Sequence, residues 1–380
     1  MRMDTGMRLL VTGGAGYIGS VVAAQLAESG HDVVVLDDLS TGHADAIPSG
    51  VTFHRGSIRG DDVAAVLATG VDAVLHFAAK SLVGESVAHP DRYWDNNLGG
   101  TLALLEAMRV AGTRKIVFSS TAAAYGEPER IPITETNPVR PTNPYGESKV
   151  AVDTALTEYA RMRQIGAVSL RYFNEAGAYQ DASGTCRGER HDPETHLIPT
   201  VLAAARRGEG IQLYGDDYPT PDGTCIRDYI HVSDLARAHL LALDATAAGR
   251  HAIYNLGSGT GYSNLEVLGA CREVTGLDIP ARVAPRRPGD PAALVASSEA
   301  IATDLGWGAE LDLRAMVADA WTFAQLTAPE GRESGTGETV AESRTGETAE
   351  VSGTADRAGT ADRAGTAGAA GTAQVGGSPR

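Results

Sequence analysis

Residues 7–19 read MRLLVTGGAGYIG, an apolar run followed by a turn rich in glycine. Gly13, Gly16 and Gly19 form the spacing G-x-x-G-x-x-G at the point where a strand would pass into a helix. Glycine lets the backbone turn sharply and approach a pyrophosphate, and the N–H groups at the helix start attract phosphate charge. The stretch therefore predicts the first strand, turn and helix of a Rossmann-type sheet.

A pair of acidic residues, Asp37 and Asp38, ends the next apolar run, residues 32–38. A carboxylate at this place accepts hydrogen bonds from the adenosine ribose hydroxyls and repels a 2′-phosphate. The pair therefore predicts NAD as the cofactor rather than NADP. It also favours a dinucleotide site over the alternative that the glycines only form a tight packing turn.

Short apolar runs alternate with segments of helical spacing up to about residue 175. The predicted strands are residues 7–13, 32–38, 72–78, 114–120 and 166–173, and the predicted helices are residues 21–30, 61–70, 97–112 and 145–163. This alternation predicts an α/β fold with a doubly wound parallel sheet and helices on both faces. We expect a cofactor domain over residues 7–177 and a smaller, partly interleaved α/β domain over residues 178–327, with helices at 232–245, 264–276 and 311–326.

Composition narrows the class of protein. The formal net charge of −16 argues against a nucleic acid or an anionic membrane as partner. The three cysteines are far apart, and no run is apolar enough to span a bilayer, which together predict a cytoplasmic protein. Residues 328–380 lack aromatic side chains and repeat GTADRAG, so we expect a disordered tail rather than a binding segment.

A tyrosine and a lysine stand four residues apart, Tyr145 and Lys149, at the start of a predicted helix. Asn143 is a suitable N-cap and Pro144 suits the first helical position. The two side chains share one helix face, so a lysine ammonium there, together with the positive nicotinamide, would favour the phenolate of Tyr145 and make it a general base. A hydroxyl at the end of an earlier strand, in Ser119-Ser120-Thr121, could bridge the phenol and a sugar oxygen.

Together, the glycine turn, the strand-end hydroxyl and the Tyr-x-x-x-Lys pair resemble the extended short-chain dehydrogenase/reductases. Longer motifs narrow the resemblance to the UDP-glucose 4-epimerase family: RYFNEAGA (171–178), HDPETHLIP (191–199), GDDYPTPDGTCIRDYIHVSDLA (215–236) and APRRPGD (284–290). The likeness covers about residues 7–327 and implies reversible C4 epimerisation of a UDP-hexose, UDP-glucose or UDP-galactose, in a homodimer. In that family a hydride leaves the sugar C4 for NAD, the 4-keto sugar turns over, and the hydride returns to the other face.

The same resemblance implies roles for individual residues. Tyr145 would be the base, Lys149 its modulator and Thr121 the hydroxyl partner. NAD would be contacted by Gly13, Gly16, Tyr17, Ile18, Gly19, Asp37, Asp38, Ser57, Ile58, Phe77, Ala78, Ala79, Asn97, Lys149 and Phe173. The UDP-sugar would be contacted by Thr121, Tyr145, Asn174, His196, Leu197, Gln212, Leu213, Tyr214, Arg227, Tyr229, Arg287, Asp290 and Leu294.

Some positions depart from the family pattern. Ser57 replaces an aspartate that usually faces adenine, Gly99 replaces an asparagine, and Arg190 replaces an acid. Leu294 shapes the pocket around the C2 substituent of the sugar, where a large aromatic residue would admit only plain hexoses. Leucine is intermediate in size, so the main alternative to a UDP-hexose enzyme is a 4-epimerase of UDP-N-acetylhexosamines or UDP-pentoses.

Other functions fit the sequence less well. A nucleotide-sugar dehydratase needs an acid and a base after Thr121, whereas residues 122–123 are alanines. A non-catalytic NAD sensor should have lost Tyr145 or Lys149. We expect no metal site, because His191 and His196 do not share a helix face and the sequence shows no companion ligands for them.

Overall fold

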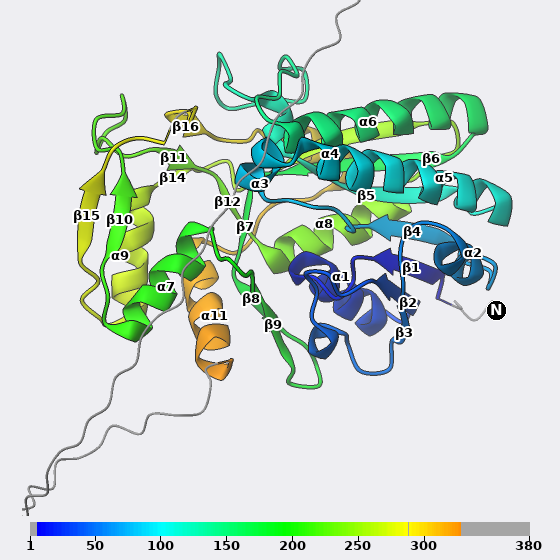
Figure 1. Ribbon diagram of the computed structural model, residues 1–380, viewed down its shortest axis with the longest axis horizontal. Helices are drawn as coiled ribbons and strands as arrows, with labels where there is room; N and C mark the ends of the chain where they lie inside the picture. Colours follow the sequence, from blue (N-terminus) through cyan, green and yellow to red (C-terminus); the bar gives the residue numbers. More distant parts are fainter. Residues whose placement is uncertain (1–5, 288, 328–380) are drawn as a thin grey trace, which may run out of the picture. The chain divides into compact units, whose positions relative to one another are not determined.

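A computed structural model describes residues 6–287 and 289–327; the predicted disordered tail, residues 328–380, lies outside the described residues. The centre is a seven-stranded sheet in the order β13-β6-β5-β4-β1-β2-β3 (Figure 1). Its strands are all parallel. Their bounds are β1 (Arg8–Thr12), β2 (Asp32–Asp37), β3 (Thr52–Arg55), β4 (Ala73–His76), β5 (Lys115–Thr121), β6 (Gly166–Tyr172) and β13 (His251–Leu256).

Helices cover both faces of this sheet, which confirms the predicted doubly wound α/β fold. Along β1, Leu9 and Val11 face one core and Leu10 faces the other, as the two-residue period of a strand requires. The first face is covered by α1 (Tyr17–Glu28) and α8 (Val232–Asp244). The second is covered by α2 (Asp61–Leu67), α5 (Gly100–Ala111) and α6 (Pro144–Arg163).

The sheet contains β3 and β13 in addition to the predicted strands. Strand β3 has only one half-buried apolar residue, Phe53, because it lies at the sheet edge, so its sequence carries little periodic signal. Strand β13 pairs with β6, from His251 opposite Ala167 to Leu256 opposite Tyr172. The prediction that residues 232–245 are a helix of the smaller domain was wrong in its placement, because α8 packs on the large sheet.

The remaining chain builds a second core from α7 (Leu197–Arg207), α9 (Asn264–Thr275) and α11 (Leu313–Leu326). Beside it, β10 (Ile211–Tyr214) pairs with β15 (Ala281–Ala284). The short strands are β7 (Asn174–Ala176), β8 (Ala178–Gln180), β9 (Cys186–Gly188), β11 (Ile226–Arg227), β12 (Tyr229–His231), β14 (Tyr262–Ser263) and β16 (Ala293–Leu294). The short helices are η1 (Ala44–Ala46), α3 (Val83–Ala88), α4 (Pro90–Tyr93), the π-helix η2 (Trp94–Gly99), η3 (Ala122–Tyr125) and α10 (Glu299–Leu305).

The strand order reverses between β1 and β4, which are neighbours in the sheet although β2 and β3 intervene in the chain. In open α/β sheets, ligands bind outside the carboxyl ends of the strands at such a reversal. The glycine turn follows β1 at this place. Within residues 6–287 and 289–327, no helix combines the length and apolar character needed to cross a membrane.

Candidate active site

A cavity of about 890 Å³ opens at the carboxyl ends of the central strands. This volume lies in the range of about 300–1,000 Å³ that ligand sites occupy. Most of the predicted site residues line it: Gly13, Gly16, Tyr17, Ile18, Gly19, Asp37, Asp38, Ser57, Ile58, Phe77, Ala78, Ala79, Thr121, Tyr145, Lys149, Phe173, Asn174, His196, Leu197, Tyr229 and Leu294. Residues that the sequence assigns separately to cofactor and substrate therefore share one cavity.

The glycine turn has the shape that a pyrophosphate requires. Gly13 has a φ of +72°, and a Cβ there would lie 2.6 Å from the backbone nitrogen of Ala78. A Cβ at Gly19 would lie 2.2 Å from the carbonyl oxygen of Gly13, so only glycine allows this approach of turn and helix. Gly16 occupies the N-cap of α1, and the first turn of that helix lines the cavity. These features fit the diphosphate of NAD.

The acidic pair after β2 stabilises the adjoining turns as well as lining the cavity. The Ala15 N–H donates to Asp37 Oδ2 at 2.9 Å, and the Leu39 N–H donates to Asp37 Oδ1 at 2.8 Å. Burial raises the pKa of the Asp37 carboxyl above its usual value. Each carboxylate oxygen has further acceptor capacity, so ribose hydroxyls could still donate to it.

The start of α6 has the predicted capping. The Asn143 side chain accepts a hydrogen bond from the Gly146 N–H at 2.9 Å, and Pro144 occupies the first turn. Tyr145 packs edge-on against Tyr93, with ring centroids 6.4 Å apart. The Lys149 ammonium donates to the Ser119 carbonyl at 2.8 Å and lies 5.9 Å from the Tyr145 ring centroid. The helix thus holds both side chains against the end of β5.

Burial dominates the electrostatics of this pair. Burial raises the pKa of Tyr145 to about 12, helped by the charge of Glu175 and opposed by a side-chain interaction with Thr121. Burial also lowers the pKa of Lys149 to about 7. Burial thus opposes the phenolate of Tyr145, and the Lys149 ammonium is directed at a backbone carbonyl, so the phenolate depends on the further positive charge that the nicotinamide would bring.

Thr121 ends β5 and caps η3, where its side chain accepts from the Ala123 N–H at 3.1 Å. Its hydroxyl lies in the same cavity as Tyr145. Ala122 and Ala123 line the cavity next to it. The two positions that a dehydratase would fill with an acid and a base thus carry methyl groups that cannot transfer protons.

Asn97, a predicted cofactor contact, lies outside the described cavity lining. It is buried, and its amide donates to the Lys80 carbonyl and the Ser148 hydroxyl, each at 3.0 Å, and accepts from the Lys80 N–H at 2.8 Å. These bonds hold the loop after β4 against α6. Asn96 lines the cavity instead, because the π-helical turn directs the two neighbours differently.

Several cavity residues were missed in the sequence. The segment 80–83 and Glu85 line the cavity after β4, a place that the carboxyl-end rule for parallel strands could have indicated. Glu175 also lines it, beside the predicted Asn174. Burial raises the pKa of the Glu175 carboxyl above its usual value.

The remaining predicted contacts lie away from the cavity lining in the described part of the chain: Gln212, Leu213, Tyr214, Arg227, Arg287 and Asp290. They interact with one another. Arg227 forms an ion pair with Asp290, and the Arg287 guanidinium stacks 4.2 Å from the Tyr214 ring centroid. Arg227 is the register neighbour of Leu294, which does line the cavity, so these residues extend one of its walls.

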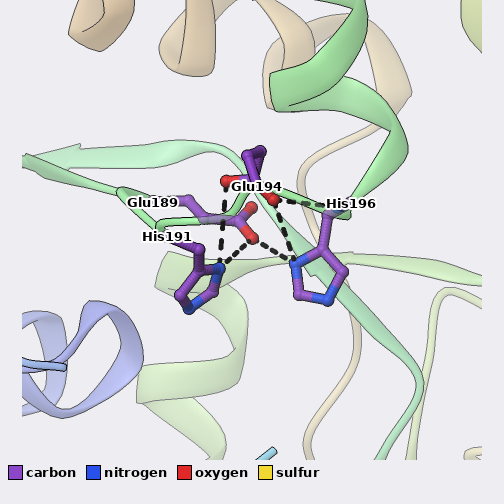
Figure 2. Close-up of side chains that lie close together, drawn as sticks. All are labelled: Glu189, His191, Glu194 and His196. Atoms are coloured by element: carbon purple, nitrogen blue, oxygen red, sulfur yellow. Dashed lines mark hydrogen bonds and ion pairs between the residues drawn. The ribbon is translucent and has the colours of Figure 1, made fainter. Parts of the chain in front are cut away.

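Beside the same cavity, four side chains from residues 189–196 point toward one another (Figure 2). We call Glu189, His191, Glu194 and His196 the His–Glu cluster; one ligand atom from each lies within 4.8 Å of all the others. The expectation that the two histidines lack companion ligands was wrong. The chain bends at residues 192–193, between β9 and α7, and so brings together residues that the linear spacing separates.

Comparison with known proteins agrees with this geometry. Residues 9–257 match the family described as "NAD dependent epimerase/dehydratase family". The UDP-glucose 4-epimerase of Streptomyces lividans is 57% identical over 322 residues, which cover 83% of this chain and 95% of that protein. The UDP-glucose 4-epimerase of Corynebacterium glutamicum is 55% identical over 320 residues, with the same coverage of each chain.

Solved structures show the same similarity. A UDP-glucose 4-epimerase from Stenotrophomonas maltophila, with bound NAD and formylated UDP-arabinopyranose, aligns with a TM-score of 0.80 at 40% identity. That alignment covers 84% of this chain and 98% of the other. The enzyme from Bifidobacterium longum, in complex with NAD+ and UDP, gives a TM-score of 0.78 at 39% identity, again covering 84% and 98%. With this fold, this cavity and these relatives, the chain belongs to the NAD dependent epimerase/dehydratase family.

Proposed function

We propose that this chain is a reversible 4-epimerase of UDP-sugars that interconverts UDP-glucose and UDP-galactose with tightly bound NAD. The observation that carries the proposal is that Tyr145, Lys149 and Thr121 line the same cavity as the glycine turn and Leu294. The cavity volume of about 890 Å³ lies toward the upper end of the range of about 300–1,000 Å³ that ligand sites occupy. Relatives more than half identical over most of the chain carry the same name.

The chemistry that NAD supplies when bound is reversible hydride acceptance at the sugar C4. Tyr145 takes the proton of the 4-hydroxyl as the hydride leaves and returns it when the hydride comes back. Burial raises the pKa of Tyr145 to about 12, so the positive charges of the nicotinamide and the Lys149 ammonium would be needed to form the phenolate that accepts this proton. Thr121 positions the sugar oxygen, and Lys149 holds the helix start against β5.

The direct test is incubation of the full-length protein with UDP-galactose, UDP-N-acetylgalactosamine and UDP-arabinose in separate samples, with products identified by NMR. We expect UDP-galactose to give UDP-glucose until equilibrium. Absence of conversion of all three sugars, with NAD present, would contradict the proposal. Loss of water from the sugar would indicate a dehydratase, which the alanines at 122 and 123 argue against.

The size of the side chain at position 294 sets which C2 substituents the sugar pocket admits. Because leucine is of intermediate size, N-acetylated sugars or pentoses are proposed as second substrates. We expect Leu294→Tyr to lower the rate on UDP-N-acetylgalactosamine at least about 10-fold relative to UDP-galactose, since the ring would fill the space of the acetamido group. Leu294→Ala is the matched control and should not lower that ratio. Equal losses on both sugars in the tyrosine variant would show that Leu294 does not select at C2.

The carboxylate of Asp37 is proposed to hold the adenosine ribose, and NAD is expected to stay bound through purification. Asp37→Ala should weaken NAD binding by about 10- to 150-fold, the equivalent of losing a hydrogen bond to a charged group, about 1.5–3 kcal/mol. Calorimetric titration of cofactor-stripped protein measures this. Asp61→Ala, on the exposed start of α2, is the control, and unchanged affinity in Asp37→Ala would place the ribose elsewhere.

We further propose a homodimer in the cytoplasm, with residues 7–177, α8 and β13 holding the cofactor and the rest of 178–327 holding the UDP-sugar. Cys186, Cys225 and Cys271 are all free thiols, as a reducing compartment permits. Leu102 and Val110 on α5 and Met162 on α6 are exposed apolar side chains that a second copy could cover. Sedimentation velocity should give twice the chain mass, and a monomer would contradict the dimer.

A further inference from the structure

The possible ligand atoms of the His–Glu cluster lie about as far apart as the ligand atoms around a bound metal ion. The His191 Nδ1 lies 2.9 Å from Glu189 Oε1 and 3.9 Å from Glu194 Oε2. The His196 Nδ1 contacts Glu189 Oε1 and lies 4.0 Å from Glu194 Oε1. Bonds of about 2.0–2.1 Å to a tetrahedral ion would place neighbouring ligand atoms about 3.4 Å apart. The observed separations of 2.9 to 4.0 Å lie on both sides of that value, so the four atoms are close to the spacing of a tetrahedral ligand set.

Several carboxylates lie in or beside the cluster. Glu189 and Glu194 belong to it, and Glu175 lines the same cavity as the two histidines. His231 pairs with Asp319 at 3.1 Å. Arg190, within the same loop, instead forms two hydrogen bonds to Asp45, at 2.7 and 3.0 Å. The arginine is thus directed away from the cluster, which leaves His191 and His196 as the groups that pair with Glu189.

The cluster is also accessible and well supported. The Glu189 side chain is only 5% exposed, which fixes its position, whereas the His196 side chain is 46% exposed. His191 and His196 both line the main cavity, so an ion could enter through it. Two imidazoles with two carboxylates suit zinc and similar transition ions, while magnesium and calcium prefer oxygen ligands alone.

We propose that the His–Glu cluster binds one divalent transition-metal ion of the zinc class through both histidine Nδ1 atoms and one oxygen of each glutamate. Such a site is separate from the Tyr145 and Lys149 chemistry. Because His196 is also a predicted UDP-sugar contact and lines the main cavity, a bound ion would lie beside the sugar site.

Zinc chloride titrated into untagged, full-length protein that has been dialysed against a chelator tests the site directly. We expect one Zn²⁺ per chain, with an excess of Mg²⁺ unable to displace it. His191→Ala and Glu189→Gln should each lower the affinity at least about 100-fold, since even the loss of an outer-shell partner costs 10–100-fold. His54→Ala, on the exposed β3, is the matched control and should bind as the unaltered protein does.

A second measurement uses the unaltered protein, in case a variant fails to fold. X-ray absorption of the zinc-loaded protein should show two imidazole ligands and no sulfur. Absence of stoichiometric zinc, sulfur ligation, or equal affinity in folded His191→Ala and Glu189→Gln would overturn the proposal and leave a hydrogen-bonded cluster. The titration measures zinc binding and follows no turnover, so failure of the proposed epimerase function would not affect its outcome.

Discussion

Replacing Tyr145 with phenylalanine is expected to lower turnover of UDP-galactose by about 100- to 10,000-fold, the contribution of a positioned acid–base group. The change removes only the phenolic oxygen, and the ring can still pack against Tyr93, 6.4 Å away between centroids. NAD and UDP binding should persist, because the substitution leaves the glycine turn and the cavity wall around Arg227 and Leu294 unchanged. Steady-state rates by NMR, with calorimetric titration of UDP, measure both quantities.

Tyr159→Phe is the matched control, since it removes the same hydroxyl near the other end of α6. It should keep a rate close to that of the unaltered protein. If Tyr145→Phe also keeps that rate, Tyr145 is not the proton-transfer group and the proposed chemistry fails. If it loses UDP and NAD binding as well, the loss of rate reflects the fold of the site rather than proton transfer.

The largest expected effect on stability comes from breaking a buried ion pair between α6 and the central sheet. Asp153 on α6 accepts from Arg171 on β6 at 2.8 and 3.0 Å, and each side chain is 4% exposed. Asp153→Ala would leave the guanidinium buried without its partner. We expect a loss of about 3–5 kcal/mol in the free energy of unfolding. Denaturant unfolding at equal cofactor content measures it.

Two further variants separate this effect from a general loss of charge. Glu129→Ala removes half of the exposed pair between Glu129 and Arg140 and should cost less than about 1 kcal/mol. The double variant Asp153→Leu/Arg171→Met should recover much of the loss, because no charge then remains buried. Equal stability of Asp153→Ala and the unaltered protein would show that water reaches Arg171.

The first half of the fold was predictable because its signals are local. An apolar strand, a glycine turn and a helix recur in order, and each element of residues 7–177 that was predicted is present. Strand β13 was not predicted and helix α8 was misplaced, since their sequences resemble those of any half-buried strand or helix. Their partners, β6 and α1, lie far away in the chain, so only the packing of apolar faces decides which core they join.

By itself, the sequence determined the Rossmann-type sheet, the preference for a dinucleotide at the glycine turn, and the pairing of Tyr145 with Lys149 on one helix face. These follow from residue spacing along single elements. The tertiary structure alone decided that Lys149 is directed at the Ser119 carbonyl, that Asn97 braces a loop, and that the His–Glu cluster exists. These properties depend on burial and on bends in loops. Both arise from contacts between segments that are distant in the sequence, which residue spacing within one helix or strand does not reveal.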